Sequence, residues 1–114
     1  VGKDEFGTQL ITALQREGVN PTGISRADIH TTLAFVHLDD RGDRSFSFCR
    51  NPGADQMLKA QDLPFDLIGN GRIFHFGSIS MTDEPARLAT IEALRFARKC
   101  NVVSVHSFIF RNSG

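Results

Sequence analysis

The sequence predicts an α/β fold that combines part of a parallel sheet with one projecting antiparallel hairpin. Between residues 73 and 105 the pattern is strand, helix, strand, and such a βαβ unit places its two strands parallel. Residues 29–38 and 44–50 are two further strand patterns joined by a short polar connection containing Gly42, which is typical of a hairpin. The near-continuous apolar strands of the βαβ unit favour a sheet that is covered on both faces.

The first predicted element is an amphipathic helix over residues 4–17. Its packing stripe is marked by apolar residues at four-residue spacing: Phe6, Leu10 and Leu14. Gly18 follows as a C-terminal stop, and the segment Asn-Pro-Thr-Gly at residues 20–23 forces a turn. The chain therefore reaches the first hairpin strand after one helix and one turn.

The hairpin is expected to have one apolar face. Its first strand is rich in β-branched and apolar side chains, and its second strand alternates between two residue types: Phe46 and Phe48 with Ser45 and Ser47. A hairpin with one apolar face suits a flap that covers something, rather than a pair of fully buried strands.

The second half of the chain is predicted to begin with a short helix and then to form the βαβ unit. Thr82 or Asp83 is expected to cap the long helix, with Pro85 in its first turn, where a missing N–H costs little. The expected bounds are residues 54–60 for the short helix, 73–79 for the first strand, about 82–99 for the long helix and 102–105 for the last strand.

Charge and composition argue against several classes of partner. The 114 residues contain 13 basic and 13 acidic side chains, so the sequence offers no electrostatic case for nucleic acid or an anionic membrane. No apolar run approaches the roughly 18 residues needed to span a bilayer. Cys49 and Cys100 lie far apart with no pairing motif, and two free thiols fit a reducing compartment, so we expect a cytoplasmic protein.

The residues that could hold a metal ion lack the necessary spacing. The histidines show no ligand spacing with each other or with the cysteines: His30, His37, His75 and His106. The aspartates of the hairpin connection, Asp39, Asp40 and Asp43, lack the Gly-centred loop and the terminal Glu of a calcium site. We therefore expect a solvated hairpin tip and no metal site.

Four stretches together resemble the ribokinase-like (phosphofructokinase B type) carbohydrate kinases, and the fructokinase branch most closely. They are VGKDEFG at residues 1–7, TTLAFV at 31–36, FSFCRNPGAD at 46–55 and FHFGSIS at 74–80. They occur in the family's order and at its spacings, so residues 1–105 are interpreted as part of such a kinase domain. The resemblance implies a three-layer α/β/α sandwich in which the hairpin, at about residues 29–50, is a small β-lid.

The activity implied by this resemblance is phosphorylation of a sugar by ATP, accompanied by Mg²⁺. In the complete enzyme the acceptor would be fructose and the product fructose 6-phosphate, and the lid would close over the sugar to exclude water. Fructose rests on resemblance to one branch of the family. Ribose, 2-keto-3-deoxygluconate and a nucleoside are the alternative acceptors.

The parts of the family that transfer phosphate would lie outside this segment. The sugar-gripping Asp and the Gly-Gly/Asn motif would precede Val1, and the Gly-Ala-Gly-Asp motif with the catalytic base, together with most of the nucleotide site, would follow Gly114. We therefore expect no catalytic residue here, and neither ATP nor Mg²⁺ bound by this segment alone. Residues 106–114 depart from the family's Asp-Pro-Asn continuation, and we interpret them as an atypical tail arising from a retained intron, a frameshift or a mis-assigned gene boundary.

The candidate sugar-binding residues are Arg50, Phe48, Phe35, Cys49 and Gly77. By resemblance, residues 48–50 of the lid contribute sugar contacts, and a guanidinium fork is a good reader of hydroxyls or a carboxylate. The alternative for Arg50 is an exposed strand-end side chain that contacts solvent or Asp55. Many relatives carry Tyr where this chain has Cys49.

The other candidates also have structural alternatives. Phe35 and Phe48 would press the apolar face of the lid against the sugar, or they would pack against each other or the body of the domain. Gly77 ends a parallel strand, where α/β folds open their ligand crevice, and its alternative is a tight strand-to-helix turn.

Two other interpretations of the whole chain stay open. In one, the chain is a truncated and catalytically inactive kinase fragment that acts as a binding or dimerisation module. Its exposed lid strands, whose edges are unpaired, would pair with a full-length partner or form a homodimer. In the other, it is not a stable domain, because apolar sheet surface is left uncovered.

Overall fold

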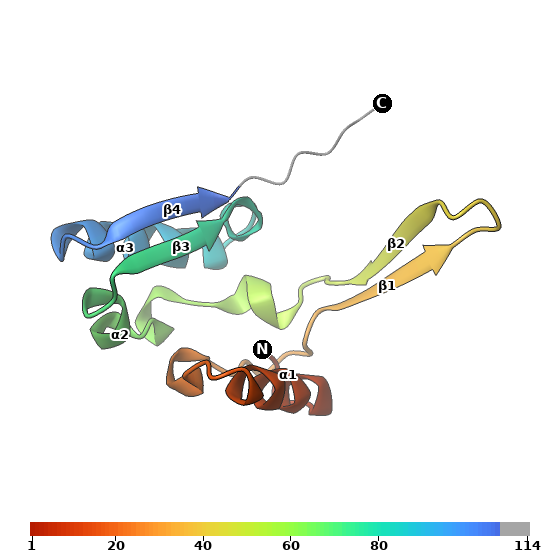
Figure 1. The fold of residues 1–114 in the computed structure, drawn as a ribbon, viewed down its shortest axis with the longest axis horizontal. Helices are drawn as coiled ribbons and strands as arrows, with labels where there is room; N and C mark the ends of the chain where they lie inside the picture. Colours follow the sequence, from red (N-terminus) through yellow and green to blue (C-terminus); the bar gives the residue numbers. More distant parts are fainter. Residues whose placement is uncertain (108–114) are drawn as a thin grey trace. The chain divides into compact units, whose positions relative to one another are not determined.

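The computed structural model describes residues 1–107, which divide into two compact units, one ending at Met57 and the other beginning at Leu58 (Figure 1). The first unit contains a helix and a two-stranded antiparallel sheet, and the second contains a two-stranded parallel sheet with its helices. The predicted combination of parallel strands and a separate hairpin is therefore confirmed. Most of the predicted C-terminal tail, residues 108–114, lies outside the described residues.

Helix α1 (Glu5–Arg16) confirms the first predicted element. Asp4 is its N-cap, and the Asp4 carboxylate accepts a hydrogen bond from the Gly7 N–H at 2.8 Å. Beyond the helix, Gly18 adopts a φ of 81°, the left-handed conformation that commonly follows a helix end and favours glycine. The predicted turn is a short 3₁₀ helix, η1 (Pro21–Gly23).

Strands β1 (Leu33–Leu38) and β2 (Arg44–Cys49) form the predicted antiparallel hairpin. β1 begins later than expected because the segment before it is bonded elsewhere. Ala27 exchanges backbone hydrogen bonds with the first residues of the chain, and the Thr31 N–H donates to the Asp4 carboxylate at 2.7 Å. This segment is therefore held at the N-terminal end of α1 and does not pair with β2.

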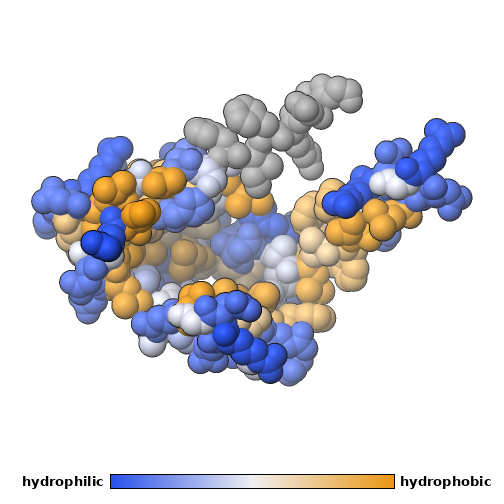
Figure 2. All heavy atoms as spheres, in the orientation of Figure 1, coloured by the Kyte–Doolittle hydropathy of each residue, from blue (hydrophilic) through white to orange (hydrophobic). Residues whose placement is uncertain are grey.

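The hairpin register sorts the side chains into two faces, because cross-strand partners point to the same side and neighbours along a strand alternate. One face carries the pairs Ala34–Phe48, Val36–Phe46 and Leu38–Arg44. The other carries Leu33–Cys49, Phe35–Ser47 and His37–Ser45. The first set of pairs, called here the apolar face, exposes each of its large apolar side chains by more than half. Figure 2 shows apolar atoms gathered toward the base of the hairpin and polar atoms at its tip.

The second unit contains the predicted βαβ arrangement. Strands β3 (Ile73–Gly77) and β4 (Val103–Ser107) pair in parallel, and α3 (Ala86–Lys99) connects them. α3 packs against the sheet through a buried stripe of small residues: Ala86, Ala89, Thr90, Ala93 and Ala97. At its C-terminal end, Phe96 meets Phe65 of α2 (Phe65–Gly69) edge to face, with ring centroids 4.9 Å apart.

One face of this small sheet is covered and the other is open. Phe74, Phe76 and Ser104 are partly buried on one face, whereas Ile73 and Val103 on the other face are 65% and 60% exposed. The sequence favoured a sheet covered on both faces, and a second covering layer is not found among the described residues of the second unit. The three-layer arrangement therefore stays a prediction for the complete domain.

Several element boundaries differ from the predictions. The expected short helix is replaced by two 3₁₀ turns, η2 (Ala54–Met57) and η3 (Ala60–Asp62). The first strand of the βαβ unit stops earlier, and η4 (Ser78–Met81) follows it. α2 was not predicted, because a five-residue helix is too short to show a helical period. β4 runs through Ser107 and so includes the first two residues of the predicted atypical tail.

The predicted cap of the long helix is wrong. The structure starts α3 after Pro85, and neither Thr82 nor Asp83 is the capping residue. The Thr82 hydroxyl donates to the Ile79 carbonyl at 2.8 Å, so it belongs to the preceding turn. The Glu84 carboxylate instead accepts from the Leu88 N–H at 3.2 Å, which satisfies one of the first donors of the helix.

None of the helices in the described part of the chain is both long enough and apolar enough to cross a membrane.

Candidate functional site

The base of the hairpin is closed by a cluster of three polar side chains, called here the base cluster: Thr32, Arg50 and Asp55. Arg50 follows β2, and its Nε donates to Asp55 Oδ2 at 2.8 Å while its Nη2 lies 2.7 Å from the same oxygen. Thr32 precedes β1, and its hydroxyl donates to Asp55 Oδ1. The Asp55 carboxylate therefore joins the outgoing and returning ends of the hairpin.

The local sequence after β2 brings Asp55 into this position. Gly53 lies against Thr32 so closely that a Cβ at position 53 would overlap the Thr32 hydroxyl. The Ala54 N–H donates to the His30 carbonyl at 2.9 Å, which ties the returning chain to the segment before β1. Glycine at position 53 is thus required by close approach.

The base cluster holds its carboxylate in the ionised form. Burial of Asp55 works against ionisation, but the hydrogen bonds from Arg50 and Thr32 and the charge of Arg50 outweigh it, so the pKa of Asp55 is below its usual value. The Arg50 side chain is only 18% exposed and the Asp55 side chain 45%. The guanidinium charge is therefore compensated within the hairpin base. The structure confirms the Asp55 contact that the sequence gave as the alternative for Arg50.

The structure separates the two candidate phenylalanines. Phe48 lies on the apolar face of the hairpin, where its ring stacks on Phe46 with centroids 6.1 Å apart. Phe35 lies on the opposite face and is 51% exposed. The expectation that both would press the same face against a ligand is therefore wrong. Phe48 pairs with Ala34, which is the neighbour of Phe35 along β1, and neighbouring residues of a strand point to opposite faces. Cys49 is exposed and shares the face of Phe35.

Gly77 belongs to the second unit, whereas the other four candidates belong to the first. It ends β3, and the Ser80 hydroxyl donates to its carbonyl at 3.0 Å, as in a tight strand-to-turn connection. A Cβ at position 77 would meet nothing among the described residues within 4 Å. These contacts agree with the turn that the sequence gave as the alternative.

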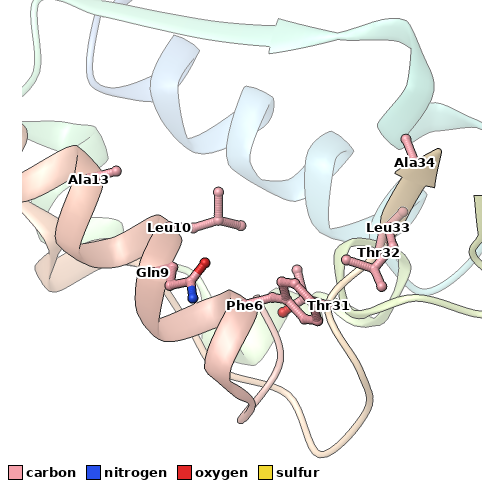
Figure 3. Close-up of a pocket in the computed structure, with 8 residues that line it drawn as sticks. All are labelled: Phe6, Gln9, Leu10, Ala13, Thr31, Thr32, Leu33 and Ala34. Carbon is pink, nitrogen blue, oxygen red and sulfur yellow. The ribbon is translucent and has the colours of Figure 1, made fainter. Parts of the chain in front are cut away.

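A cavity of about 380 Å³ lies between α1 and the segment that enters β1 (Figure 3). Its lining residues are Phe6, Gln9, Leu10, Ala13, Thr31, Thr32, Leu33 and Ala34. The two threonine hydroxyls already have partners, since Thr31 bonds to Asp4 and Gly2 and Thr32 bonds to Asp55. A sugar site needs several convergent polar groups, so this mainly apolar cavity is better suited to packing. The helical stripe at Phe6 and Leu10 was the sequence signal for it.

A second polar cluster, around Asp4, was not found from the sequence. The Asp4 carboxylate accepts from the Thr31 N–H and the Thr31 hydroxyl, both at 2.7 Å, as well as from the Gly7 N–H. These hydrogen bonds, those from Thr31 first, lower the pKa of Asp4 to about 2. Arg26 reinforces the same corner by donating to the Gly2 and Asp4 carbonyls. The cluster is structural, because its groups bond to one another.

The described residues do not provide a metal centre. Within residues 1–107 the structure brings together no group of three or more His, Cys, Asp or Glu side chains that could hold a metal ion. The donor sets at Asp4 and Asp55 are occupied by protein hydrogen bonds. These residues therefore do not fit a metal–nucleotide site.

Comparison with known proteins gives one consistent result. The model of the pfkB family of carbohydrate kinases matches residues 1–111. Fructokinase-2 of Oryza sativa subsp. japonica is 44% identical over 103 residues, an alignment that covers 90% of this chain and 31% of the relative. The chain thus spans about a third of the length of the curated relatives it matches.

Solved structures agree with the sequence match. The fructokinase from Xylella fastidiosa with bound ATP superposes with a TM-score of 0.89 at 36% identity, covering 98% of this chain and 34% of that one. The fructokinase from Vibrio cholerae O395, in its fructose, ADP and calcium ion bound form, gives a TM-score of 0.74 at 31% identity, with 95% and 34% covered. From the extent of the family match, this chain belongs to the pfkB family of carbohydrate kinases.

Proposed function

We propose that this chain is a segment of an ATP-dependent kinase that, when complete, phosphorylates fructose to fructose 6-phosphate. The observation that carries the proposal is the agreement of sequence and fold with fructokinases along nearly the whole chain. The solved relatives bind ATP in one case, and fructose, ADP and a calcium ion in another, which supports a sugar and a nucleotide with its metal as the ligands of the complete enzyme.

In this proposal the hairpin is the lid of the sugar site and Arg50 its polar contact. ATP supplies the phosphoryl group when it is bound to the complete enzyme. The role of this segment is to cover and orient the sugar, because a closed lid excludes water that would otherwise compete as an acceptor. Phe48 contributes from the apolar face, and Phe35 or Cys49 would contribute from the opposite face. Gly77 would lie at the carboxyl end of the parallel sheet.

The test is to capture the native gene product from a source extract with an antibody against residues 4–97. Its intact mass and its activity would then be measured with Mg-ATP and fructose, ribose, 2-keto-3-deoxygluconate or a nucleoside. We expect a mass well above 12.6 kDa and the highest kcat/KM with fructose. Preference for another acceptor would replace fructose in the proposal, and failure to phosphorylate any of them would overturn the kinase assignment.

A second candidate function is a binding or dimerisation module without catalysis. The apolar face of the hairpin favours it, since Val36, Phe46 and Phe48 are 54%, 56% and 57% exposed. Both outer edges of the two-stranded hairpin are also unpaired within the described residues, and unpaired strand edges favour association. This candidate predicts a homodimer formed through the hairpin. This candidate function would replace the kinase proposal if the native gene product has the mass of this segment.

The proposed compartment is the cytoplasm. Cys49 and Cys100 are both exposed and free, which fits a reducing environment.

A further inference from the structure

We propose that Asp55 sets the charge preference of the sugar site. By pairing with Arg50 it cancels the guanidinium charge and occupies one carboxylate-binding edge, so that Arg50 serves neutral hydroxyls and disfavours a sugar acid. This inference rests on the proposed place of Arg50 in the sugar site. It concerns a residue that none of the sequence patterns singled out as a ligand contact.

Asp55 already occupies one edge of the Arg50 guanidinium. A guanidinium offers five N–H donors and binds a carboxylate best through a two-nitrogen edge. In the base cluster the edge formed by Nε and Nη2 faces Asp55 Oδ2, at 2.8 and 2.7 Å. A ligand carboxylate would have to displace Asp55 from this edge or use the other one. Hydroxyl groups need only single N–H donors, and the remaining nitrogen, Nη1, can supply them.

The negative charge of Asp55 stays beside Arg50. The Asp55 carboxylate is fixed from its other side, because Thr32 donates to Oδ1. Asp55 is therefore bonded to both ends of the hairpin, at Thr32 and at Arg50. Moving its carboxylate away from Arg50 would break these hydrogen bonds. A second carboxylate brought to Arg50 would lie close to Asp55, and like charges at such a distance disfavour binding. A neutral polyol meets no such repulsion.

The base cluster differs in exposure from an ordinary surface ion pair. The Lys3–Asp28 pair in the same unit has side chains 59% and 87% exposed, whereas Arg50 is 18% exposed. In exposed ion pairs water readily replaces the partner, and the pair contributes little to stability. Lys3 therefore stays available to other anions. The more enclosed Arg50 is held by its partner, and this makes Asp55 able to determine what Arg50 can bind.

The test compares the chain with its Asp55→Asn variant, using the Asp28→Asn variant as a matched control. Each ¹⁵N-labelled chain would be titrated with sodium gluconate and with fructose while the Arg50 Nε–H resonance is followed by NMR. We expect gluconate to bind at Arg50 about three- to tenfold more tightly in the Asp55→Asn chain, the range that loss of one partly exposed charge partner allows. The Asp28→Asn chain should behave like the parent. Equal gluconate affinity in all three chains would overturn the proposal.

A second measurement does not depend on a variant that folds. In the unmodified chain the Arg50 Nε–H should be protected from exchange and show a scalar coupling to the Asp55 carboxyl carbon through the hydrogen bond. An Arg50 resonance at the position of free arginine, with no such coupling, would overturn the proposal. Fructose gives a separate result. If it shifts Arg50 neither in these chains nor in the complete native protein, the place of Arg50 in the sugar site is wrong, while the gluconate comparison still decides the role of Asp55.

Discussion

Asp4 and Asp55 each join segments that are distant in the sequence. Asp4 bonds to Thr31, 27 residues away, and Asp55 bonds to Thr32, 23 residues away. The sequence pointed to Asp55 as a partner of Arg50, because the two residues are close along the chain. It did not point to either threonine, because local patterns carry no information on which distant hydroxyl a carboxylate will meet. The candidate site was therefore predicted in residue type and only partly in its contacts.

The close approach of Gly53 to Thr32 gives the first prediction at this scale. Replacing Gly53 by Ala would push a Cβ into the Thr32 hydroxyl and disturb the base cluster. We expect a loss of about 1–3 kcal/mol in the free energy of unfolding, as for overpacking at a close contact. Urea denaturation would measure it. Gly77→Ala is the control, with an expected change within about 0.5 kcal/mol, because its Cβ meets no described atom within 4 Å. A Gly53→Ala chain as stable as the parent would contradict the prediction.

The lowered pKa of Asp4 predicts an acid-dependent loss of stability. Its pKa is about 2 in the folded chain against an ordinary value of 3.8, so its hydrogen bonds stabilise the fold fully above about pH 3.8. This contribution is lost as the pH falls from there through about 2. We expect Asp4→Asn to reduce the dependence of the urea midpoint on pH over this interval. A carboxyl titration of Asp4 by NMR gives a direct check, and a midpoint near 3.8 would contradict the prediction.

Helices and strands were predictable in proportion to their length and regularity. α1 and α3 carry three or more turns of an apolar stripe, and both were located to within a few residues. α2 and the 3₁₀ turns are too short to repeat a period, so they were missed or merged. The cap of α3 was misplaced because the preceding turn uses the Thr82 hydroxyl. The hairpin was found, but its register, which divides Phe35 from Phe48, depends on pairing that the pattern alone did not fix.

The two faces of the hairpin allow a test of the proposed homodimer. Val36 lies on the apolar face and is 54% exposed, whereas Ser45 is an exposed residue of the opposite face. If the apolar face is buried between two copies, Val36→Lys places a charge in that interface and should weaken self-association by about tenfold or more. Ser45→Lys adds the same charge outside the interface and should leave association near that of the parent. Sedimentation velocity over a range of concentrations measures both.

Equal effects of the two lysines would show that the face is not the interface. A parent chain that stays monomeric at every concentration tested would rule out the proposed homodimer.

At the scale of the whole molecule, two apolar surfaces are left open within residues 1–107. They are the hairpin's apolar face and the side of the β3–β4 sheet that carries Ile73 and Val103. Relatives about three times as long share the fold of this segment, and under the proposal of a complete kinase we expect the rest of that protein to cover the sheet. The sequence predicted the βαβ unit that needs this cover. Its near-continuous apolar strands also predicted cover on both faces, whereas the three-layer arrangement was inferred from the family resemblance.

The isolated 114-residue chain is expected to show no phosphoryl transfer from Mg-ATP to fructose. A general base works best with a pKa near the operating pH. Among the described residues the carboxylates with shifted pKa are Asp4, Asp28 and Asp55, and each is shifted downward by hydrogen bonds or a neighbouring cation. Asp4 and Asp55 are also committed to partners that fix the fold. ADP formation would be measured with fructose present and absent. Fructose-dependent turnover that persists through repeated purification, at constant specific activity, would show that this segment contains a catalytic base after all.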